Sequence, residues 1–181
     1  MGWVDDGYQD PAIEKLDGHR PAGPLRGGKY SAFEGGTRVP FMARWPVRIK
    51  PGVSDALICQ IDFLATFASL TGQTLGAGEG PDSVDMLPAL VGESKLGRAE
   101  LVEQAAALSL RKGPRKYIEP KQGPKFYLAT RTETGLDPDG QLFDLGSDLG
   151  ETNNLAPQQP AATTDFHDHL ERIRAAARTR P

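Results

Sequence analysis

The clearest periodic pattern of apolar positions lies near the end of the chain. Ala162, Phe166, Leu170, Ile173 and Ala177 follow one another at spacings of 4, 4, 3 and 4 residues. Residues at these spacings share one face of an α-helix, so the pattern predicts an amphipathic terminal helix. We expect its apolar stripe to cover a small sheet.

Short alternating runs ahead of that helix predict the sheet. Leu108–Arg111 and Lys116–Glu119 flank the turn Lys112–Arg115, an arrangement typical of a β-hairpin. Two further strands are expected at Phe126–Thr130 and Gln141–Leu145. Together the four runs predict a small antiparallel four-stranded sheet.

A strand followed by a helix is predicted in the first half of the chain. Ser54–Gln60 is an apolar run typical of a buried strand. Asp62 stands at the N-cap position of a helix over Phe63–Thr71, and Gly72 supplies its stop. We expect the apolar face of this helix to pack against a sheet built largely by other sequence, at the edge of an α/β layer.

Turn-forming residues suggest how the chain is divided. Asp85–Gly92 predicts a short helix that ends at its glycine. We place a boundary near residue 92. Residues 1–92 then form an α/β part, and residues 93–181 form a subdomain of antiparallel sheet and terminal helix.

Composition limits the classes of partner. The 181 residues include 24 acidic and 21 basic side chains, a net charge of −3, so no overall basic field attracts nucleic acid or an anionic membrane. No apolar run approaches the roughly 18 residues of a membrane span, so we expect a soluble chain of undetermined compartment. The single cysteine, Cys59, excludes an intrachain disulfide. Any anionic ligand must therefore be bound by local groups.

One glycine-rich stretch offers such groups. Gly27-Gly28-Lys29 is followed closely by Glu34-Gly35-Gly36-Thr37-Arg38-Val39-Pro40. Glycine permits a positive φ and a close approach of backbone to ligand, and lysine supplies a compact positive charge for a tetrahedral oxyanion. The stretch predicts a site for sulfate or phosphate chemistry.

Two alternatives concern the same residues. Gly23 and Gly28-Lys29 match most of the phosphate-binding pattern G-x-x-x-x-G-K-[ST], but Tyr30 stands where a Ser or Thr hydroxyl would ligate magnesium. Pro24 also removes a backbone donor that such a loop needs. The other alternative is a plain glycine turn with a solvated lysine.

A family resemblance favours sulfate. Pro24–Phe41 closely resembles the segment that opens the C-terminal third of the sulfatase (arylsulfatase) family. Further pieces follow in the order that sulfatases show, and the likeness runs from about Gly18 to Ala156: Arg44-Trp45-Pro46, Val53-Ser54-Asp55, Ile61–Thr66, Leu70-Thr71-Gly72 and Leu142–Ala156. The resemblance implies the C-terminal part of an alkaline-phosphatase-like α/β fold, in which residues 1–92 are the edge of the core with its sulfate-contacting loop.

The resemblance also implies roles for individual residues. Lys29 is expected to contact the sulfate group and to stabilise negative charge while the ester bond breaks. His19 and Arg26 are candidate substrate contacts. Glu34 and Arg38 are expected to form a charge pair that holds the glycine turn in the geometry Lys29 requires.

Other parts of the family mechanism have no match in this chain. Sulfatases use an oxidised Cys or Ser within Cys/Ser-x-Pro-x-Arg, a divalent cation (calcium or magnesium) and a histidine; Cys59 is followed by Gln60-Ile61-Asp62 and does not fit. Neither the pair Asp5-Asp6 nor the pair Asp165 and His169 matches the family's metal ligands. We therefore expect no metal ligands on this chain.

The expected function follows from that incompleteness. The chain should supply the lysine loop of a sulfatase that hydrolyses an unspecified sulfate ester, and it should be inactive without the missing N-terminal part as its partner. Full-length members are often exported or periplasmic. A non-catalytic module that binds anions, and the other half of a split enzyme, stay open as alternatives.

Overall fold

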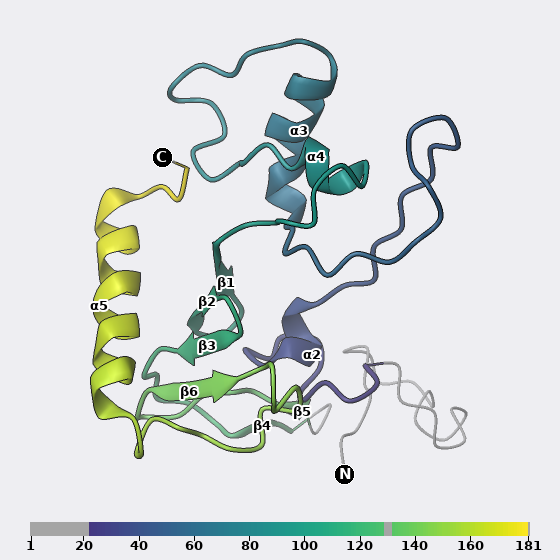
Figure 1. Ribbon diagram of the computed structural model, residues 1–181. Coiled ribbons are helices and arrows are strands. Elements are labelled where there is room, and N and C mark those ends of the chain that lie inside the picture. Colours follow the sequence, from purple (N-terminus) through teal and green to yellow (C-terminus); the bar gives the residue numbers. More distant parts are fainter. Residues whose placement is uncertain (1–21, 129–131, 181) are drawn as a thin grey trace. The chain divides into compact units, whose positions relative to one another are not determined.

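The computed structural model describes residues 22–128 and 132–180, which form two compact units (Figure 1). The first unit contains residues 22–39 together with Val102–Leu170, and the second contains Pro40–Leu101 together with residues 171–180. The lysine loop is thus grouped with the sheet of the second half of the chain. The predicted boundary near residue 92, between an α/β part and a C-terminal subdomain of the family fold, stays a prediction.

A four-stranded antiparallel sheet is the centre of the first unit. Its strands follow the order β1-β2-β3-β6, with bounds Glu100–Gln104, Leu108–Lys112, Arg115–Ile118 and Gln141–Asp144. Leu110 pairs with Tyr117 across β2 and β3, and Tyr117 pairs with Leu142 across β3 and β6. The predicted hairpin and the four-stranded sheet are confirmed.

The strand predicted at Phe126–Thr130 does not belong to the four-stranded sheet, so this prediction is wrong. β4, Phe126–Tyr127, pairs with β5, Thr132–Glu133, in a separate two-stranded ribbon instead of joining the larger sheet. The fourth strand of the sheet is β1, and not the strand expected at Phe126–Thr130. Pro120, two residues after the end of β3, has no N–H for a ladder hydrogen bond, so the chain leaves the sheet there and returns only as β6.

The core of the first unit joins the lysine loop to the sheet. Ala32 and Phe33 are buried with Ile118 and Phe143 in one apolar cluster. The rings of Phe33 and Phe143 meet edge to face, 6.0 Å apart at an interplanar angle of 71°, a favourable aromatic geometry. The Ala32 N–H also donates to the Thr134 carbonyl at 2.9 Å. The residues just after Lys29 are therefore firmly anchored.

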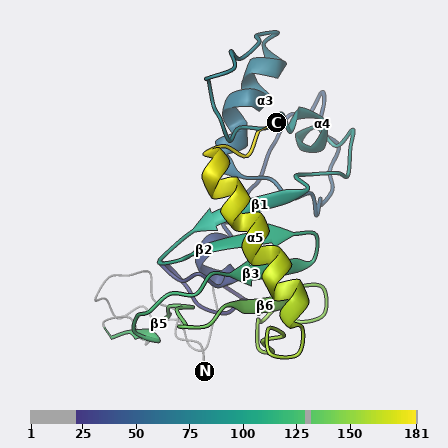
Figure 2. The ribbon, with the colours of Figure 1, turned by 90° about the vertical axis from the view of Figure 1, so that its left-hand side faces the viewer.

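The terminal helix α5, Pro160–Ala176, lies across the strands as predicted (Figure 2). Leu170 from its apolar stripe is buried, and Phe166 is half-buried. Ala177 lies beyond the helix with a left-handed φ of 52°, so the helix ends one residue before the last position of the predicted stripe. No helix among residues 22–128 and 132–180 combines the length and apolar content needed to cross a membrane.

Short helices make up the second unit: η1, Gln60–Asp62; α3, Phe63–Leu70; and α4, Leu87–Leu90. Gly72 has the predicted left-handed φ, 70°, just after α3. Asp62 occupies the N-cap position, but its carboxylate accepts no N–H from the first turn of α3. It binds the guanidinium of Arg98 at 2.9 Å and the backbone N–H groups of Cys59 and Val84 instead.

The strand predicted at Ser54–Gln60 is absent, and this prediction is wrong for the described unit. Within this segment, the Leu57 carbonyl accepts a hydrogen bond from the Arg98 N–H at 2.7 Å, but no ladder of backbone hydrogen bonds extends from it. A strand needs paired backbone groups along its length, and among its described residues the second unit contains no strand apart from Glu100 and Leu101, the first two residues of β1. The large side chains of α3, Leu64, Phe67 and Leu70, are exposed in it. Packing of this face against a sheet of other sequence stays a prediction.

Candidate functional site

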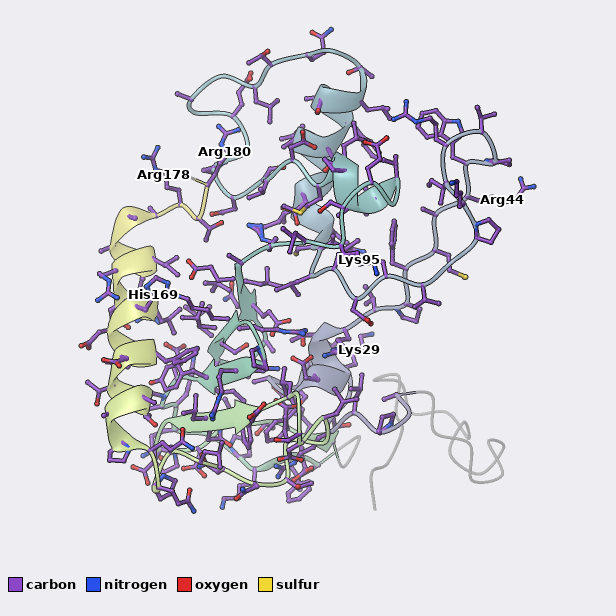
Figure 3. All side chains as sticks on the ribbon, in the orientation of Figure 1. Lys29, Arg44, Lys95, His169, Arg178 and Arg180 are labelled. Atoms are coloured by element: carbon purple, nitrogen blue, oxygen red, sulfur yellow. The ribbon has the colours of Figure 1, made fainter. Side chains whose placement is uncertain are left out.

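Lys29 lies at the tip of a tight turn in the first unit. The Ser31 N–H donates to the Gly28 carbonyl at 2.9 Å, which closes a four-residue turn around Lys29 and Tyr30. Tyr30 has a φ of 75°, the left-handed value that type II turns require at their third residue. Lys29 is exposed beside α2, Glu34–Thr37, with its Nζ 5.2 Å from the Tyr30 ring centroid (Figure 3).

The glycines after Lys29 are required by contacts within the loop. A Cβ at Gly35 would lie 2.5 Å from the Arg26 carbonyl oxygen, and one at Gly36 would lie 2.2 Å from the Ser31 carbonyl oxygen. The Gly35 N–H donates to the same Arg26 carbonyl at 2.8 Å. The two halves of the loop therefore pack backbone against backbone, which fixes its shape before any ligand binds.

This packing makes a prediction for Gly36. Gly36→Ala should lower the free energy of unfolding by about 2–4 kcal/mol, because a methyl group overlaps backbone oxygens that have no free rotamer to move away. Chemical denaturation measures the change. Gly78→Ala is the matched control, since no atom lies within 4 Å of its added Cβ and its φ is not positive. Equal stability of the two variants would contradict this account of the loop.

Arg26 anchors the start of the loop. Its Nε and Nη2 bind the two carboxylate oxygens of Glu133 at 2.9 and 2.7 Å, and its Nη1 donates to the Glu151 carbonyl at 2.5 Å. The hydrogen bond from Arg26 lowers the pKa of Glu133 below its ordinary value. The guanidinium also stacks 4.0 Å above the Phe33 ring. These contacts are all internal, and the substrate contact expected of Arg26 stays a prediction.

Glu34 fixes the other end of the loop. Its side chain is fully buried and pairs with Arg38 four residues later, with Lys116 Nζ at 2.9 Å and with Arg111 Nη1 at 3.5 Å. Burial alone would raise the pKa of Glu34, but Lys116 and Arg38 outweigh it, so the pKa is lowered. The expected Glu34–Arg38 charge pair is present, and its effect on Lys29 stays a prediction.

Lys116 is the centre of a buried charge cluster, the Lys116 cluster, which also contains Glu34, Glu103 and Glu151. Its ammonium on β3 lies 2.9 Å from Glu34, 3.5 Å from Glu103 and 3.4 Å from Glu151. Burial opposes the charge of Lys116, but the three carboxylates raise its pKa. Burial also raises the pKa of Glu151 to about 7, against the opposing attraction of Lys116.

Sequence reasoning did not identify the Lys116 cluster. Lys116 and Glu103 carry no motif, and Glu151 lies within the family segment Leu142–Ala156 without a role of its own. Alternation along β3 places Lys116 on the same face as Ile118, and Arg115 on the same face as Tyr117. Each face thus carries one basic and one apolar residue, so the sequence pattern does not identify Lys116 as an inward side chain.

Metal ligands and His19 are the remaining predicted features. His19 and the pair Asp5-Asp6 lie outside the described residues. Among residues 22–128 and 132–180, no three His, Cys, Asp or Glu side chains form a group that could hold a metal ion, and Asp165 with His169 on α5 does not make one. The described residues therefore do not fit the divalent cation that the family uses.

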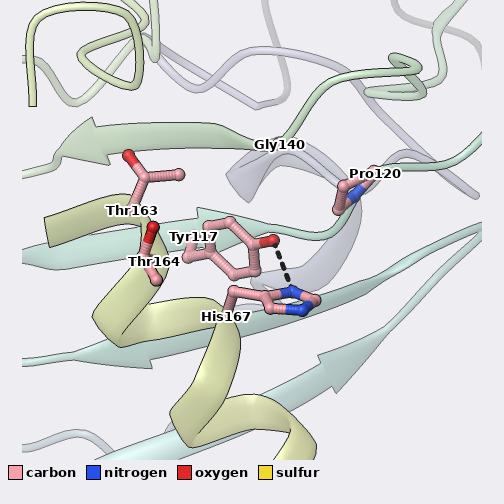
Figure 4. Close-up of a pocket in the computed structure, with 6 residues that line it drawn as sticks. All are labelled: Tyr117, Pro120, Gly140, Thr163, Thr164 and His167. Atoms are coloured by element: carbon pink, nitrogen blue, oxygen red, sulfur yellow. Dashed lines mark hydrogen bonds between the residues drawn. The ribbon is translucent and has the colours of Figure 1, made fainter. Parts of the chain in front are cut away.

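A shallow pocket of about 260 Å³ lies elsewhere in the first unit, where α5 meets β3 (Figure 4). The Tyr117 hydroxyl and His167 Nδ1 are 3.2 Å apart across it. Its remaining lining residues are Pro120, Gly140, Thr163 and Thr164. It holds no carboxylate and no lysine or arginine, so it offers little for binding a sulfate group.

The loop geometry also bears on the nucleotide-binding alternative. A phosphate-binding loop leads directly into a helix whose N-terminus faces the phosphate. Here a turn follows Lys29, and α2 begins only at Glu34 and has four residues. The described loop does not have the geometry of that motif.

Comparison with known proteins identifies the family. The sulfatase family model matches residues 11–73. N-acetylgalactosamine-6-O-sulfatase of Bacteroides thetaiotaomicron is 44% identical over 173 residues, which cover 94% of this chain and 34% of that protein. Arylsulfatase A of Bos taurus is 35% identical over 148 residues, which cover 74% of this chain and 29% of that protein.

A solved structure agrees with these sequence matches. It was described for the metabolism of multiple glycosaminoglycans by Bacteroides thetaiotaomicron and is 43% identical, with a TM-score of 0.90 over 96% of this chain and 36% of that one. The chain thus spans about a third of the length of the relatives it matches. Its mixed α/β fold is that of the alkaline-phosphatase-like sulfatases. Family model, relatives and fold agree, and this chain belongs to the sulfatase family.

Proposed function

We propose that this chain is part of a sulfatase that hydrolyses sulfate esters, and that Lys29 contacts the sulfate group. The observation that supports this role is the position of Lys29: an exposed amine at the tip of a turn whose two ends are anchored by Arg26 and Glu34. The backbone that carries this cation is held in place before the substrate arrives. Preorganised charge of this kind costs no reorganisation when the substrate reacts.

The chemical contribution of Lys29 is electrostatic. As the bond between sulfur and the ester oxygen breaks, negative charge grows on the leaving oxygen, and the sulfate group itself is anionic throughout. An ammonium beside these oxygens stabilises the transition state by roughly 3 kcal/mol or more when water is excluded from the site. The turn geometry gives Lys29 a fixed origin from which its side chain reaches the substrate.

The same proposal includes a catalytic nucleophile and a divalent cation supplied by sequence outside this chain. Cys59 lacks the proline and arginine of the sulfatase nucleophile signature. The described residues hold no metal site. About two thirds of the length of each relative has no counterpart in this chain. The nucleophile and metal ligands belong to that missing portion in this proposal.

A substrate class follows from the relatives. The Bacteroides thetaiotaomicron relative, 44% identical, is an N-acetylgalactosamine-6-O-sulfatase by name. We therefore take a 6-O-sulfated amino sugar as the first substrate to test. Aryl sulfates such as 4-nitrophenyl sulfate serve as a general probe of sulfatase chemistry.

The purified chain alone is expected to hydrolyse neither probe in buffer that contains calcium or magnesium. A chimera in which this chain replaces the matching third of the Bacteroides thetaiotaomicron relative should hydrolyse the 6-O-sulfated sugar. Turnover by the isolated chain would contradict the proposed incompleteness. A folded chimera without turnover would contradict the proposed function, and sulfate binding by the lone chain would then favour an anion-binding module.

A further inference from the structure

Glu151 connects both ends of the Lys29 loop to one residue of a distant segment. Its backbone carbonyl accepts the Arg26 Nη1 hydrogen bond at 2.5 Å, and its carboxylate Oε2 accepts the Glu34 N–H at 2.7 Å. Arg26 and Glu34 are the residues that bracket Lys29 in the chain. A single residue from the segment after β6 thus holds the loop at both ends.

The backbone of Glu151 is unusual. Its φ is 50°, in the left-handed region that residues with a Cβ avoid. Glycine adopts this conformation without strain, yet a glutamate stands here with its side chain fully buried. Observed strain of this kind is found where the surrounding contacts depend on that particular residue. Here those contacts are the two hydrogen bonds to the loop.

Charged groups of several neighbouring elements lie near the Glu151 carboxylate, including the guanidinium of Arg26. Lys116 on β3 lies 3.4 Å from Oε1, while the Glu34 carboxylate approaches from α2. Glu103 on β1 also forms an ion pair with Lys116, and Arg111 on β2 forms one with Glu34. Burial and the nearby Glu34 charge outweigh Lys116, so the pKa of Glu151 is raised to about 7. Its charge therefore changes near neutral pH.

We propose that Glu151 is a positioning residue that clamps the Lys29 loop through its two hydrogen bonds, and that the charge on its carboxylate sets how firmly the loop is held. When the carboxyl ionises, the hydrogen bond from the Glu34 N–H becomes charge-assisted and stronger. The effect on catalysis rests on the proposed function of Lys29. The clamp itself is a property of this chain and is measured without any catalysis.

The first experiment records ¹⁵N–¹H NMR spectra of the chain between pH 5 and pH 8.5. In the wild-type chain, the Glu34 amide proton should move downfield as the pH rises, with a midpoint near pH 7. The chemical shifts of the amides in the Lys29 turn should change with the same midpoint. Glu151→Gln keeps an oxygen acceptor but has no titratable proton, so the loop should keep its shifts and lose this pH dependence. Glu151→Ala removes the acceptor, and hydrogen exchange of the Glu34 amide should accelerate about tenfold or more.

The control is Glu103→Gln. It removes one carboxylate from the same Lys116 cluster, and the partners of Glu103 among the described residues, Lys116 and Ser109, lie outside the loop. It should leave the exchange of the Glu34 amide within about twofold of wild type. A loop that titrates identically in Glu151→Gln and wild type, or that loosens equally in Glu103→Gln and Glu151→Ala, would overturn the clamp.

The second experiment measures kinetics in the active chimera. Glu151→Ala should lower kcat more than it changes KM, because a misplaced Lys29 affects the transition state more than ground-state binding. Glu151→Gln should keep most of kcat and remove an inflection near pH 7 from the pH profile. If the chimera has no activity at all, the proposed function fails while the NMR result still decides the clamp. Unchanged kcat in Glu151→Ala, together with a loosened loop, would overturn the positioning role.

Discussion

Lys29→Ala in the complete sulfatase is expected to lower kcat/KM for a sulfate ester by about 10²–10³-fold, the range seen when one preorganised charge-stabilising donor is removed. The reason is geometric. Lys29 sits at the tip of a turn whose ends are fixed by Arg26 and Glu34, so the backbone that carries its ammonium is already in place when negative charge develops. Steady-state kinetics with a 6-O-sulfated amino sugar measures the loss.

Two controls separate this role from general effects of charge and folding. Lys95→Ala removes an exposed lysine of the second unit and should leave kcat/KM within about twofold of wild type (Figure 3). The thermal midpoint of Lys29→Ala should also stay near that of wild type, because the Lys29 side chain is exposed. Wild-type turnover by Lys29→Ala would remove Lys29 from the mechanism.

Lys29→Arg gives a finer test of the same site. The guanidinium keeps the charge but spreads it over a plane and reaches further than an ammonium. If Lys29 acts as a compact charge at a fixed distance, Lys29→Arg should recover only part of the activity lost in Lys29→Ala. Full recovery would show that the charge matters and its placement does not.

Local sequence signals predicted the elements of this fold that depend on neighbours along the chain. The hairpin of β2 and β3, the terminal helix and the stop of α3 at Gly72 follow from short-range periodicity and turn residues, and all are present. The strand expected at Ser54–Gln60 is absent from the described structure because a strand is completed by its partners. A single apolar run does not specify those partners.

The candidate site was also predicted only in the part that local sequence determines. The glycines around Lys29 predicted a close approach of the backbone to a ligand, and at Gly35 and Gly36 the close approach that the structure shows is to the loop's own backbone. The groups that hold it lie far away in sequence: Lys116 is 82 residues from Glu34, and Glu151 is 117 residues from it. Pairings at that distance leave no local pattern, so neither residue was predicted to support the loop.

Lys116→Met is expected to have the largest effect on stability, a loss of about 3–5 kcal/mol in the free energy of unfolding near pH 8. The wild-type ammonium neutralises carboxylates of Glu34, Glu103 and Glu151 that lie within 3.5 Å of it. Methionine matches the volume of the stem but leaves these carboxylates to repel one another in a buried site. Urea denaturation followed by circular dichroism measures the change.

The pH dependence of this loss distinguishes charge from packing. Without Lys116, the folded-state pKa values of the buried carboxylates should rise above their unfolded value near 4.5. A carboxyl with a raised folded pKa destabilises the fold above that pKa, and the penalty disappears as the pH falls through it. The deficit of Lys116→Met should therefore shrink between pH 8 and pH 5, whereas a defect in packing would be the same at both values.

Two further variants complete the test. Lys121→Met is the control, because Lys121 is an exposed lysine of the same unit and its replacement should change stability by less than about 0.5 kcal/mol. Adding Glu151→Gln to Lys116→Met removes one buried negative charge and should restore part of the lost stability at pH 8. If the double variant is no more stable than Lys116→Met, uncompensated charge is not the cause of the loss. The cluster would then stabilise the loop through the shape and hydrogen bonds of its side chains.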